Sequence, residues 1–349
     1  MPQKPLKLLI ANHRWWFPTM VSGADIANHE FARRFKRNGV DVRVFGMVAP
    51  NVEGTTRQRN YITDGVRVNL VQSDFIRRLT DIIEVFRPDI VMTTSPESSS
   101  STDDIHRMMN VFEHYSLPVV IYIHELEPVM SLFADVYHKL AAIVTNSHFM
   151  AGRIRERWQR DAVAIYPVPS SDTFKVTEAH GDFITFFNPT RRKGLEIVEH
   201  LVKNELAGHP FLFVEGFMDA GSHGVALVRS GNVVHARRSP DVATIYNLTR
   251  TLIVPSQWEE PFGRVALEAM YNQIPVIASN TGGLPESVGE GGWLIDDFAN
   301  PESWAAAILE MENDECRKDS ILAGNTHMEN FSLAQQYSEF MGVFSNVLH

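Results

Sequence analysis

Two glutamates, Glu260 and Glu268, lie eight positions apart on either side of a turn rich in Pro and Gly. The helix-forming run 264–271 follows Gly263 directly, and a helix that begins there presents free N–H groups and a positive dipole end to an anion. Two carboxylates would repel a bare phosphate, but they accept hydrogen bonds from neutral hydroxyls on either side of it. A sugar nucleotide has this layout of hydroxyls, diphosphate and hydroxyls.

This segment resembles the signature of the family 4 retaining glycosyltransferases, in which two glutamates are separated by seven residues. Here Glu260-Pro-Phe-Gly-Arg-Val-Ala-Leu-Glu268 fits that spacing, and the companion motif Gly-Gly-x-Pro-Glu stands at 282–286. The resemblance implies a retaining glycosyltransferase that moves a hexosyl or related sugar from a nucleotide diphosphate sugar to an acceptor hydroxyl. A small molecule, a glycolipid and a polysaccharide precursor all remain open as acceptors. Without these flanking motifs, two glutamates at this spacing would fit any solvated helix.

The resemblance also assigns donor contacts. It places Glu268 on the ribose and Glu260 on the hydroxyls of the donor sugar. The segment Arg191-Arg192-Lys193 resembles the family's basic pair, an Arg and a Lys that bind the donor diphosphate. Lys193 is assigned to the Lys position. Because the loop is shorter than is usual in the family, either Arg191 or Arg192 fits the Arg position. Each charge-assisted hydrogen bond to the leaving diphosphate would contribute about 1.5–3 kcal/mol. The other expected donor-site residues are Gly23, Glu215, Arg237 (near the base), Pro261, Phe262, Gly263, Arg264 and Val265.

Acceptor residues are expected in the first half of the chain. Trp15, Trp16 and Phe17 follow the first expected strand, where they would either stack on an acceptor or fix their loop to its own domain. His124 lies where relatives often have a His near the acceptor hydroxyl; a His held by structural hydrogen bonds at a strand end is the alternative. The residues expected to act in catalysis are His124, Arg192, Lys193 and Glu260. No obligate catalytic base is identified.

A paired acid, Asp103-Asp104, invites comparison with a metal site. Ser101 or Thr102 before it is a suitable N-cap, and acids in the first turn of a helix are favoured by the dipole. We interpret the pair as a helix start. We therefore expect no metal and no cofactor, with the nucleotide sugar as co-substrate.

The elements that position these residues alternate between β-rich and helix-forming runs. Near-continuous apolar strands separated by helices predict parallel sheets covered on both faces, with ligands at the carboxyl ends of the strands. Helices are expected at 25–37, 75–86, 241–248, 264–271 and 333–348. Strands are expected at 8–12, 41–46, 66–71, 89–94, 118–124, 141–147, 162–168, 183–188, 211–216, 233–236, 252–254, 276–279 and 293–295.

The length of 349 residues predicts two domains. A break rich in Pro and Ser at 167–173 separates an acceptor-binding domain, 1–172, from a donor-binding domain, 173–332. The resemblance implies an α/β GT-B fold of two doubly wound Rossmann-like domains that face a central cleft. It also implies that a last helix, 333–349, crosses back to the first domain, and that domain closure excludes water.

Composition limits the function classes. The chain has 44% hydrophobic residues, a net charge of −10 and one cysteine, which disfavour nucleic acid as a partner and exclude a disulfide framework. No apolar run approaches the ~20 residues that span a bilayer, and the run 8–11 is too short for a signal peptide. We expect a cytoplasmic enzyme, monomeric or homodimeric. The basic residues of the helix at 25–37 form a solvated face or, as in some relatives, touch a membrane, so at most peripheral membrane contact is expected.

Other nucleotide-binding and hydrolytic classes lack their motifs. Gly-x-Gly-x-x-Gly after the first strand, the P-loop motif and the Gly-x-Ser-x-Gly elbow are all absent. Two alternatives remain, a sugar-nucleotide epimerase of GT-B fold and a non-catalytic GT-B scaffold protein. The presence of both glutamates together with Lys193 argues against the scaffold.

Overall fold

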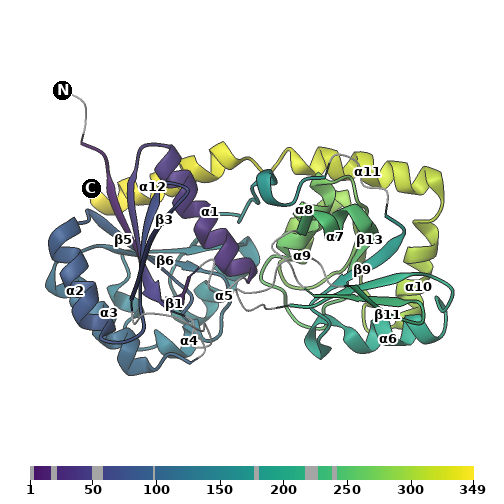
Figure 1. The fold of residues 1–349 in the computed structure, drawn as a ribbon, viewed down its shortest axis with the longest axis horizontal. Coiled ribbons are helices and arrows are strands. Elements are labelled where there is room, and N and C mark those ends of the chain that lie inside the picture. The colour runs from purple at the N-terminus through teal and green to yellow at the C-terminus, as the bar shows by residue number, and fades with distance from the viewer. Residues whose placement is uncertain are drawn as a thin grey trace. The chain divides into compact units, whose positions relative to one another are not determined.

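The structure, a computed structural model, describes residues 4–16, 22–48, 58–96, 99–176, 181–216, 227–237 and 242–349 (Figure 1). The chain forms two compact units. Unit 1 is Met1–Pro167 together with Ala334–His349, and unit 2 is Val168–Leu333. Each unit is built on its own sheet, so each is described by itself.

Unit 1 has an eight-stranded sheet in which the strand order reverses at β1. The order is β3 (Gln58–Thr63), β4 (Val66–Val71), β2 (Asp41–Met47), β1 (Lys7–Trp15), β5 (Ile90–Thr94), β6 (Val119–Ile123), β7 (Ala142–Thr145) and β8 (Val163–Ala164). All neighbours pair in parallel except β3, which runs antiparallel to β4. The loops after β1 and β5 therefore diverge at a switch point, where open α/β sheets bind ligands.

Helices cover both faces of this sheet, and alternate residues of β1 supply a core on each face. Leu9 and Ala11 belong to the cluster that contains side chains of α2 (Phe75–Phe86), α3 (Thr102–His114) and α5 (His148–Trp158). Leu8 and Ile10 belong to the cluster on α1 (Gly23–Arg37) and α12 (Leu333–Leu348). Two shorter helices, α4 (Val129–Leu132) and η1 (Tyr137–Lys139), complete the unit.

The last helix completes the core of unit 1. Phe340 of α12 lies with its ring centroid 5.0 Å from Phe31 and 5.2 Å from Phe35, both on α1. Figure 1 shows α12, in yellow, beside α1, in purple. Because Phe340 is 1% exposed, the face of α1 that would otherwise meet water is covered by a segment made at the far end of the chain.

Unit 2 repeats the doubly wound plan with seven strands. The order is β11 (Leu227–Ser230), β12 (Val233–Ala236), β10 (Phe211–Val214), β9 (Phe183–Phe187), β13 (Thr249–Val254), β14 (Val276–Ser279) and β15 (Trp293–Ile295). Among the described strands of this second sheet, only the β11–β12 pairing is antiparallel. The switch point falls between β9 and β13.

The helices of unit 2 pack on its two sheet faces. They are α6 (Leu195–Lys203), α7 (Val242–Leu248), α8 (Arg264–Tyr271), α9 (Leu284–Val288), α10 (Pro301–Glu310) and α11 (Asp314–Met328), with short 3₁₀ turns η2 (Ser171–Thr173), η3 (Arg191–Lys193) and η4 (Gly289–Gly291). Buried side chains of α6 and α10 share one cluster, and those of α8 and α9 share another.

The predicted doubly wound α/β fold is confirmed, although several strand bounds differ; the strand predicted at 162–168, for example, is only Val163–Ala164. The strand predicted at 8–12 continues to Trp15, which pairs with Met47 after a shift of register. The antiparallel edge strands β3 and β11 carry no apolar run, because an edge strand exposed to water does not need one; all four residues of β11 are exposed. The helix start at Ser101 is confirmed, since its hydroxyl accepts from the Asp104 amide in a capping box.

Candidate functional site

The two loops that leave the switch point of unit 2 lie against each other. They follow β9 and β13 and comprise 188–194 and 255–263. The Gln257 N–H donates to the Arg192 carbonyl at 2.8 Å. Gly194, at φ +92°, lies so close to the second loop that a Cβ there would come within 2.0 Å of the Pro255 carbonyl oxygen. This approach brings the basic turn beside the loop that carries Glu260.

Glu260 is buried among polar partners in the second loop. Its Oε1 accepts hydrogen bonds from the Ser256 hydroxyl at 2.6 Å and from the Lys193 ammonium. Both partners bind the same carboxylate oxygen, and no residue in the described ranges binds Oε2. A carboxylate oxygen with free lone pairs is suited to accept a hydrogen bond from a ligand hydroxyl.

The Gly-Gly-Leu-Pro-Glu motif fixes the backbone on which Glu260 stands. The Gly283 N–H donates to the Glu260 carbonyl at 2.6 Å. A Cβ at Gly282 would lie 2.4 Å from that carbonyl oxygen, and a Cβ at Gly283 would lie 2.3 Å from the Pro261 carbonyl oxygen. Two consecutive glycines are required because two backbones meet here without space for side chains.

Helix α8 begins at Gly263 without a side-chain cap. Gly263 is in the left-handed region at φ +92°, and no acidic residue lies in the first turn. The helix start therefore keeps its positive dipole end unneutralised by a local acid, as an anion site requires. The preceding Pro261 and Phe262 are buried, so either would meet a donor through its backbone. Val265 in the first turn is half-buried.

Glu268, on α8, has protein partners on both carboxylate oxygens. Arg264 donates to Oε1 at 2.8 Å, and the Tyr246 hydroxyl donates to Oε2 at 2.6 Å. Tyr246 is fully buried and comes from α7. Each oxygen retains capacity for one more hydrogen bond. Sequence reasoning missed Tyr246, because nothing local marks a tyrosine 22 positions before its partner.

The three cations of η3 have different surroundings. The Arg191 side chain is 87% exposed and lies 3.0 Å from Glu196. The Arg192 guanidinium lies 4.6 Å from the centroid of the Trp258 ring, and the Lys193 ammonium lies 5.4 Å from the same centroid. Trp258 was not among the sequence-predicted site residues, although it stands inside the motif loop.

The remaining donor candidates are at the carboxyl ends of β10 and β12. Glu215 follows β10, Arg237 follows β12, and both side chains are exposed. The Glu215 N–H donates to the Ala236 carbonyl at 2.9 Å, so the two strand ends are neighbours. Residues 238–241, beside Arg237, lie outside the described residues.

In unit 1, His124 directly follows β6 and lies within a network of hydrogen bonds. It is 7% exposed, and its Nε2 lies 2.7 Å from the Asn28 carbonyl oxygen, Oδ1, which can only accept. The backbone N–H of His124 donates to the Ser95 hydroxyl, and its backbone carbonyl accepts from the Asn146 side chain. These bonds fit the structural interpretation of His124, and they also fix the ring orientation that a role near an acceptor would need.

Of the three aromatic residues expected on the acceptor side, Trp15 and Trp16 have different surroundings. Trp15 is the last residue of β1 and is half-buried. Trp16 is 1% exposed and belongs to the core cluster on α1, which favours the interpretation that it fixes the chain to its own domain. Phe17 lies outside the described residues. Gly23 is the exposed first residue of α1, and a Cβ there would meet nothing within 4 Å.

Two polar pairs at the switch point of unit 1 were also missed by sequence reasoning. Arg14 donates to the buried Asp25 carboxylate at 2.8 Å. The His13 Nδ1 lies 2.7 Å from the Ser100 hydroxyl, and burial lowers the pKa of His13 while the Asp104 carboxylate partly opposes this shift. The partners in the second pair are 87 positions apart, so no local motif reveals them. Within the described ranges no three His, Cys, Asp or Glu side chains form a metal-binding group.

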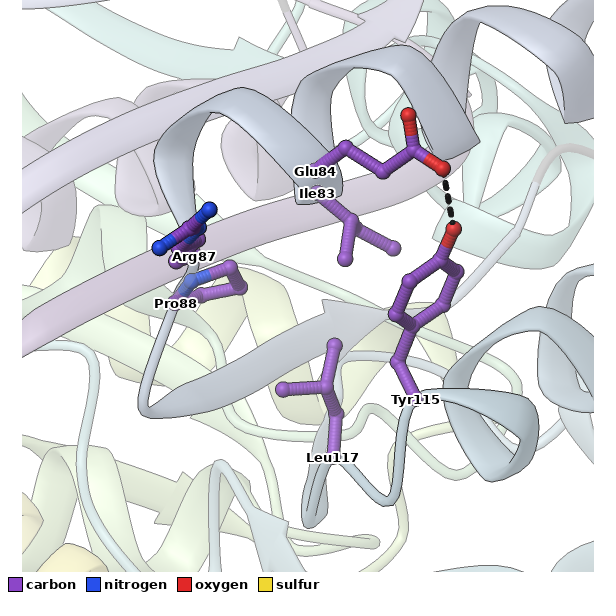
Figure 2. Close-up of a pocket in the computed structure, with 6 residues that line it drawn as sticks. All are labelled: Ile83, Glu84, Arg87, Pro88, Tyr115 and Leu117. Carbon is purple, nitrogen blue, oxygen red and sulfur yellow. Dashed lines mark hydrogen bonds between the residues drawn. The ribbon is translucent and has the colours of Figure 1, made fainter.

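A hollow of about 520 Å³ lies elsewhere on unit 1 (Figure 2). Its lining is Ile83, Glu84, Arg87, Pro88, Tyr115 and Leu117, and the Tyr115 hydroxyl donates to Glu84. Pro88 and Leu117 shortly precede β5 and β6, so the hollow is at the amino ends of these strands. It contains none of the candidate residues and lies at the opposite end of the sheet from the switch point.

The fold defines the class of protein. Sucrose-phosphate synthase from Thermosynechococcus elongatus superposes with a TM-score of 0.74 at 16% identity, covering 99% of both chains. HepE from Anabaena in complex with UDP-glucose superposes with a TM-score of 0.76 at 14% identity, covering 98% of this chain and 100% of that one. With its two doubly wound sheets, the chain has the GT-B fold.

Sequence comparison gives the family. The model for glycosyltransferase family 4 matches residues 21–169, and the model for glycosyl transferases group 1 matches residues 228–326. Matches to both models are characteristic of the family 4 glycosyltransferases of GT-B fold, which bears out the predicted resemblance. The chain is 28% identical over 188 residues to a D-inositol 3-phosphate glycosyltransferase of Corynebacterium kroppenstedtii, covering 48% of this chain and 41% of the relative. It is 36% identical over 83 residues to spore coat protein SA of Bacillus subtilis, covering 23% and 22%.

The chain spans less than half the length of the curated relatives it matches. No helix in the described part of the chain combines the length and the apolar character needed to cross a bilayer.

Proposed function

We propose that this chain is a retaining glycosyltransferase that moves a sugar from a nucleotide diphosphate sugar to an acceptor hydroxyl. The observation that carries the proposal is the meeting of Lys193, Ser256 and Glu260 at the switch point of unit 2, beside the uncapped start of α8. Cation, helix dipole and a carboxylate with a free oxygen match the diphosphate and the sugar hydroxyls of such a donor. A relative named as a glycosyltransferase and a similar fold bound to UDP-glucose support it.

The proposed donor contacts follow from the charges. The diphosphate binds at the start of α8, where it contacts Lys193 and a neighbouring Arg. The Lys193 ammonium then donates to a phosphate oxygen as well as to Glu260. Glu260 accepts from the sugar hydroxyls and Glu268 from the ribose. Glu215 and Arg237 lie at neighbouring strand ends toward the base.

The proposed chemistry needs no protein acid at the leaving group. The acceptor oxygen forms a bond to the anomeric carbon, the bond from that carbon to the diphosphate oxygen breaks, and the acceptor proton passes to the departing phosphate. Lys193 and the Arg stabilise the charge that develops there, at about 1.5–3 kcal/mol for each charge-assisted hydrogen bond. Unit 1 supplies His124 near the acceptor hydroxyl, with Trp15 at the end of β1.

We further propose that turnover needs no divalent metal, because the cations and helix amides meet the diphosphate charge. Turnover should be unchanged in EDTA. A loss of turnover that Mg²⁺ or Mn²⁺ restores would contradict this and would direct attention back to Asp103 and Asp104.

The experiment that tests the function is slow hydrolysis of the donor in the absence of acceptor. Nucleotide sugars are first screened by thermal shift, since a ligand at ~100 times its Kd adds ~2.7 kcal/mol of stability. The bound donor should then release free sugar of retained anomeric configuration. Lys193→Ala should slow this release at least about tenfold, which corresponds to about 1.4 kcal/mol.

Trp15→Ala is the control on the acceptor side. It should leave donor hydrolysis nearly unchanged while lowering transfer to an acceptor. NMR of the products decides between the classes: an epimerised sugar nucleotide would identify an epimerase, and no turnover with any tightly bound donor would favour a scaffold.

A further inference from the structure

We infer that Trp258 is a positioning residue of the donor site, whose indole ring holds Arg192 and Lys193 as the pair that binds the diphosphate. This inference rests on the function proposed above. It goes beyond the signature glutamates, since it assigns a role to a residue inside the loop that no motif marks.

The geometry is that of two cations on one aromatic ring. The Arg192 guanidinium carbon is 4.6 Å and the Lys193 ammonium nitrogen 5.4 Å from the centroid of Trp258. Both distances are within the ~6 Å at which the ring quadrupole attracts a cation. Lys193 is additionally tied to Glu260, whereas Arg192 is exposed and depends on the ring for its direction.

Two adjacent cations need an aromatic ring or another partner to stay side by side, because like charges repel and long side chains are flexible. Arg191, one position earlier in the same turn, lacks the ring: its side chain is 87% exposed and points to Glu196, on α6. The contrast assigns the Arg of the diphosphate pair to Arg192, which the sequence left open between the two.

Trp258 can fix the direction of these side chains because its own loop is fixed to theirs. The Gln257 N–H, next to Trp258, donates to the Arg192 carbonyl at 2.8 Å. Gly194, next to Lys193, allows Pro255 to approach within a distance that excludes any Cβ. The ring and the two cations therefore stand on backbones that are joined on both sides, so the ring sets where the charges lie.

The test is binding of UDP, GDP and ADP by titration calorimetry, with the matching nucleosides as a second probe. For the diphosphate that binds wild type best, Trp258→Leu should raise Kd about tenfold, because leucine keeps apolar bulk but has no quadrupole. Trp258→Phe, which keeps a π face, should raise it only about threefold. Affinity for the nucleoside, which carries no phosphate, should not change.

Two comparisons complete the design. Arg192→Ala should weaken diphosphate binding at least about fivefold more than Arg191→Ala. Trp293→Leu is the matched control, since Trp293 is a partly exposed tryptophan of the same unit, on β15. It should bind like wild type, and circular dichroism should confirm that all variants are folded.

Each result separates the inference from the proposed function. If wild type binds none of the three diphosphates, both fail. If wild type binds but Trp258→Leu binds equally well, or if Leu and Phe variants lose the same amount, the inference alone is wrong. A parallel loss of nucleoside affinity in a folded Trp258→Leu would also overturn it, since the ring would then contact the nucleoside rather than orient the cations.

Discussion

The two signature glutamates are chemically different although they flank the same helix start. Glu260 has both of its partners on one oxygen, whereas Glu268 has a partner on each. Glu260 thus offers a free oxygen, while Glu268 is held rigidly by Arg264 and Tyr246. A ribose hydroxyl would donate to a carboxylate whose orientation the protein has already fixed. Less conformational entropy is therefore lost on binding.

Glu268→Gln should therefore weaken binding of the nucleoside diphosphate and leave the fold intact. The amide presents an NH₂ group where Arg264 or Tyr246 also donates, so one hydrogen bond is lost and the free energy of unfolding falls by about 1.5–3 kcal/mol. Titration calorimetry and chemical denaturation measure the two effects.

Tyr246→Phe is the companion variant, because it removes one neutral donor and keeps the carboxylate. It should cost about 1.5–3 kcal/mol of stability, because the lost hydrogen bond goes to a charged carboxylate. Unchanged diphosphate affinity in folded Glu268→Gln would show that Glu268 does not bind the ribose.

At this scale, the sequence alone points to candidate residues where they are concentrated in one stretch, and not where folding joins distant ones. The spacing of Glu260 and Glu268 is visible as a local motif, and so is Lys193 followed directly by Gly194. Tyr246, Trp258 and the His13–Ser100 pair are ordinary residues until folding brings their partners near. Trp16 shows the converse: the conspicuous run of aromatics left open whether it contacts an acceptor or fixes its loop, and the structure buries it.

Among the elements, loops that touch backbone to backbone hold the site together. Gly194→Ala should be more destabilising than an ordinary glycine substitution, because it combines a left-handed φ with a Cβ 2.0 Å from Pro255. Gly39→Ala is the matched control: Gly39 is at φ +87° with nothing within 4 Å. The control should lose about 1–2 kcal/mol from backbone strain alone.

Chemical denaturation should show Gly194→Ala exceeding Gly39→Ala, and only Gly194→Ala should weaken diphosphate binding. Equal losses in the two variants would mean that the loops separate easily and that their contact does not order the site.

Helix α11 packs on η4 through a histidine that burial keeps neutral. A Cβ at Gly289 would lie 2.3 Å from the His327 ring. Burial lowers the pKa of His327, while backbone hydrogen bonds and Glu290 partly oppose the shift. The unfolded chain then binds a proton at a higher pH than the folded one, so stability is complete above about pH 6.5 and falls as the pH drops toward the folded pKa.

Lowering the pH from about 7.5 to about 5.5 should therefore lower the Tm, and by less in His327→Gln than in wild type. Calorimetry at both pH values measures the difference. An equal fall in both proteins would show that His327 does not contribute; the pKa values of His13 and His29 are lowered by burial too, so a residual fall is expected.

The predicted elements were found because buried strands and helices carry apolar residues in a regular pattern. The strands at 66–71, 233–236, 276–279 and 293–295 and the helices at 75–86 and 264–271 have the predicted bounds. Edge strands lie outside this rule, since β3 and β11 carry no continuous apolar run and are recognised by their pairing with β4 and β12. The continuation of β1 to Trp15 likewise depends on its partner Met47, which a single segment does not reveal.

At the scale of the molecule, each unit has hydrophobic clusters of its own, and α12 packs into one of those of unit 1. Phe340→Ala should cost about 3–5 kcal/mol in unit 1, because a fully buried aromatic ring is removed. Diphosphate binding, which we assign to unit 2, should persist wherever the variant remains folded.

Denaturation followed by calorimetry and by ligand binding distinguishes the two units. An early transition that spares diphosphate binding is the expected result. A loss of binding in step with that transition would mean that the units do not unfold separately.

The place of α12 has a consequence for biosynthesis. Arg34 on α1 and its hydrogen-bond partner Gln336 are 302 positions apart. On the ribosome, α1 emerges early with Phe31 and Phe35 ready to pack, but their aromatic partners on α12 are translated only after all of unit 2. Synthesis of unit 1 thus starts before that of unit 2, but its core is complete only when α12 has been made. Until then the nascent chain presents the apolar face of α1, on which chaperones act.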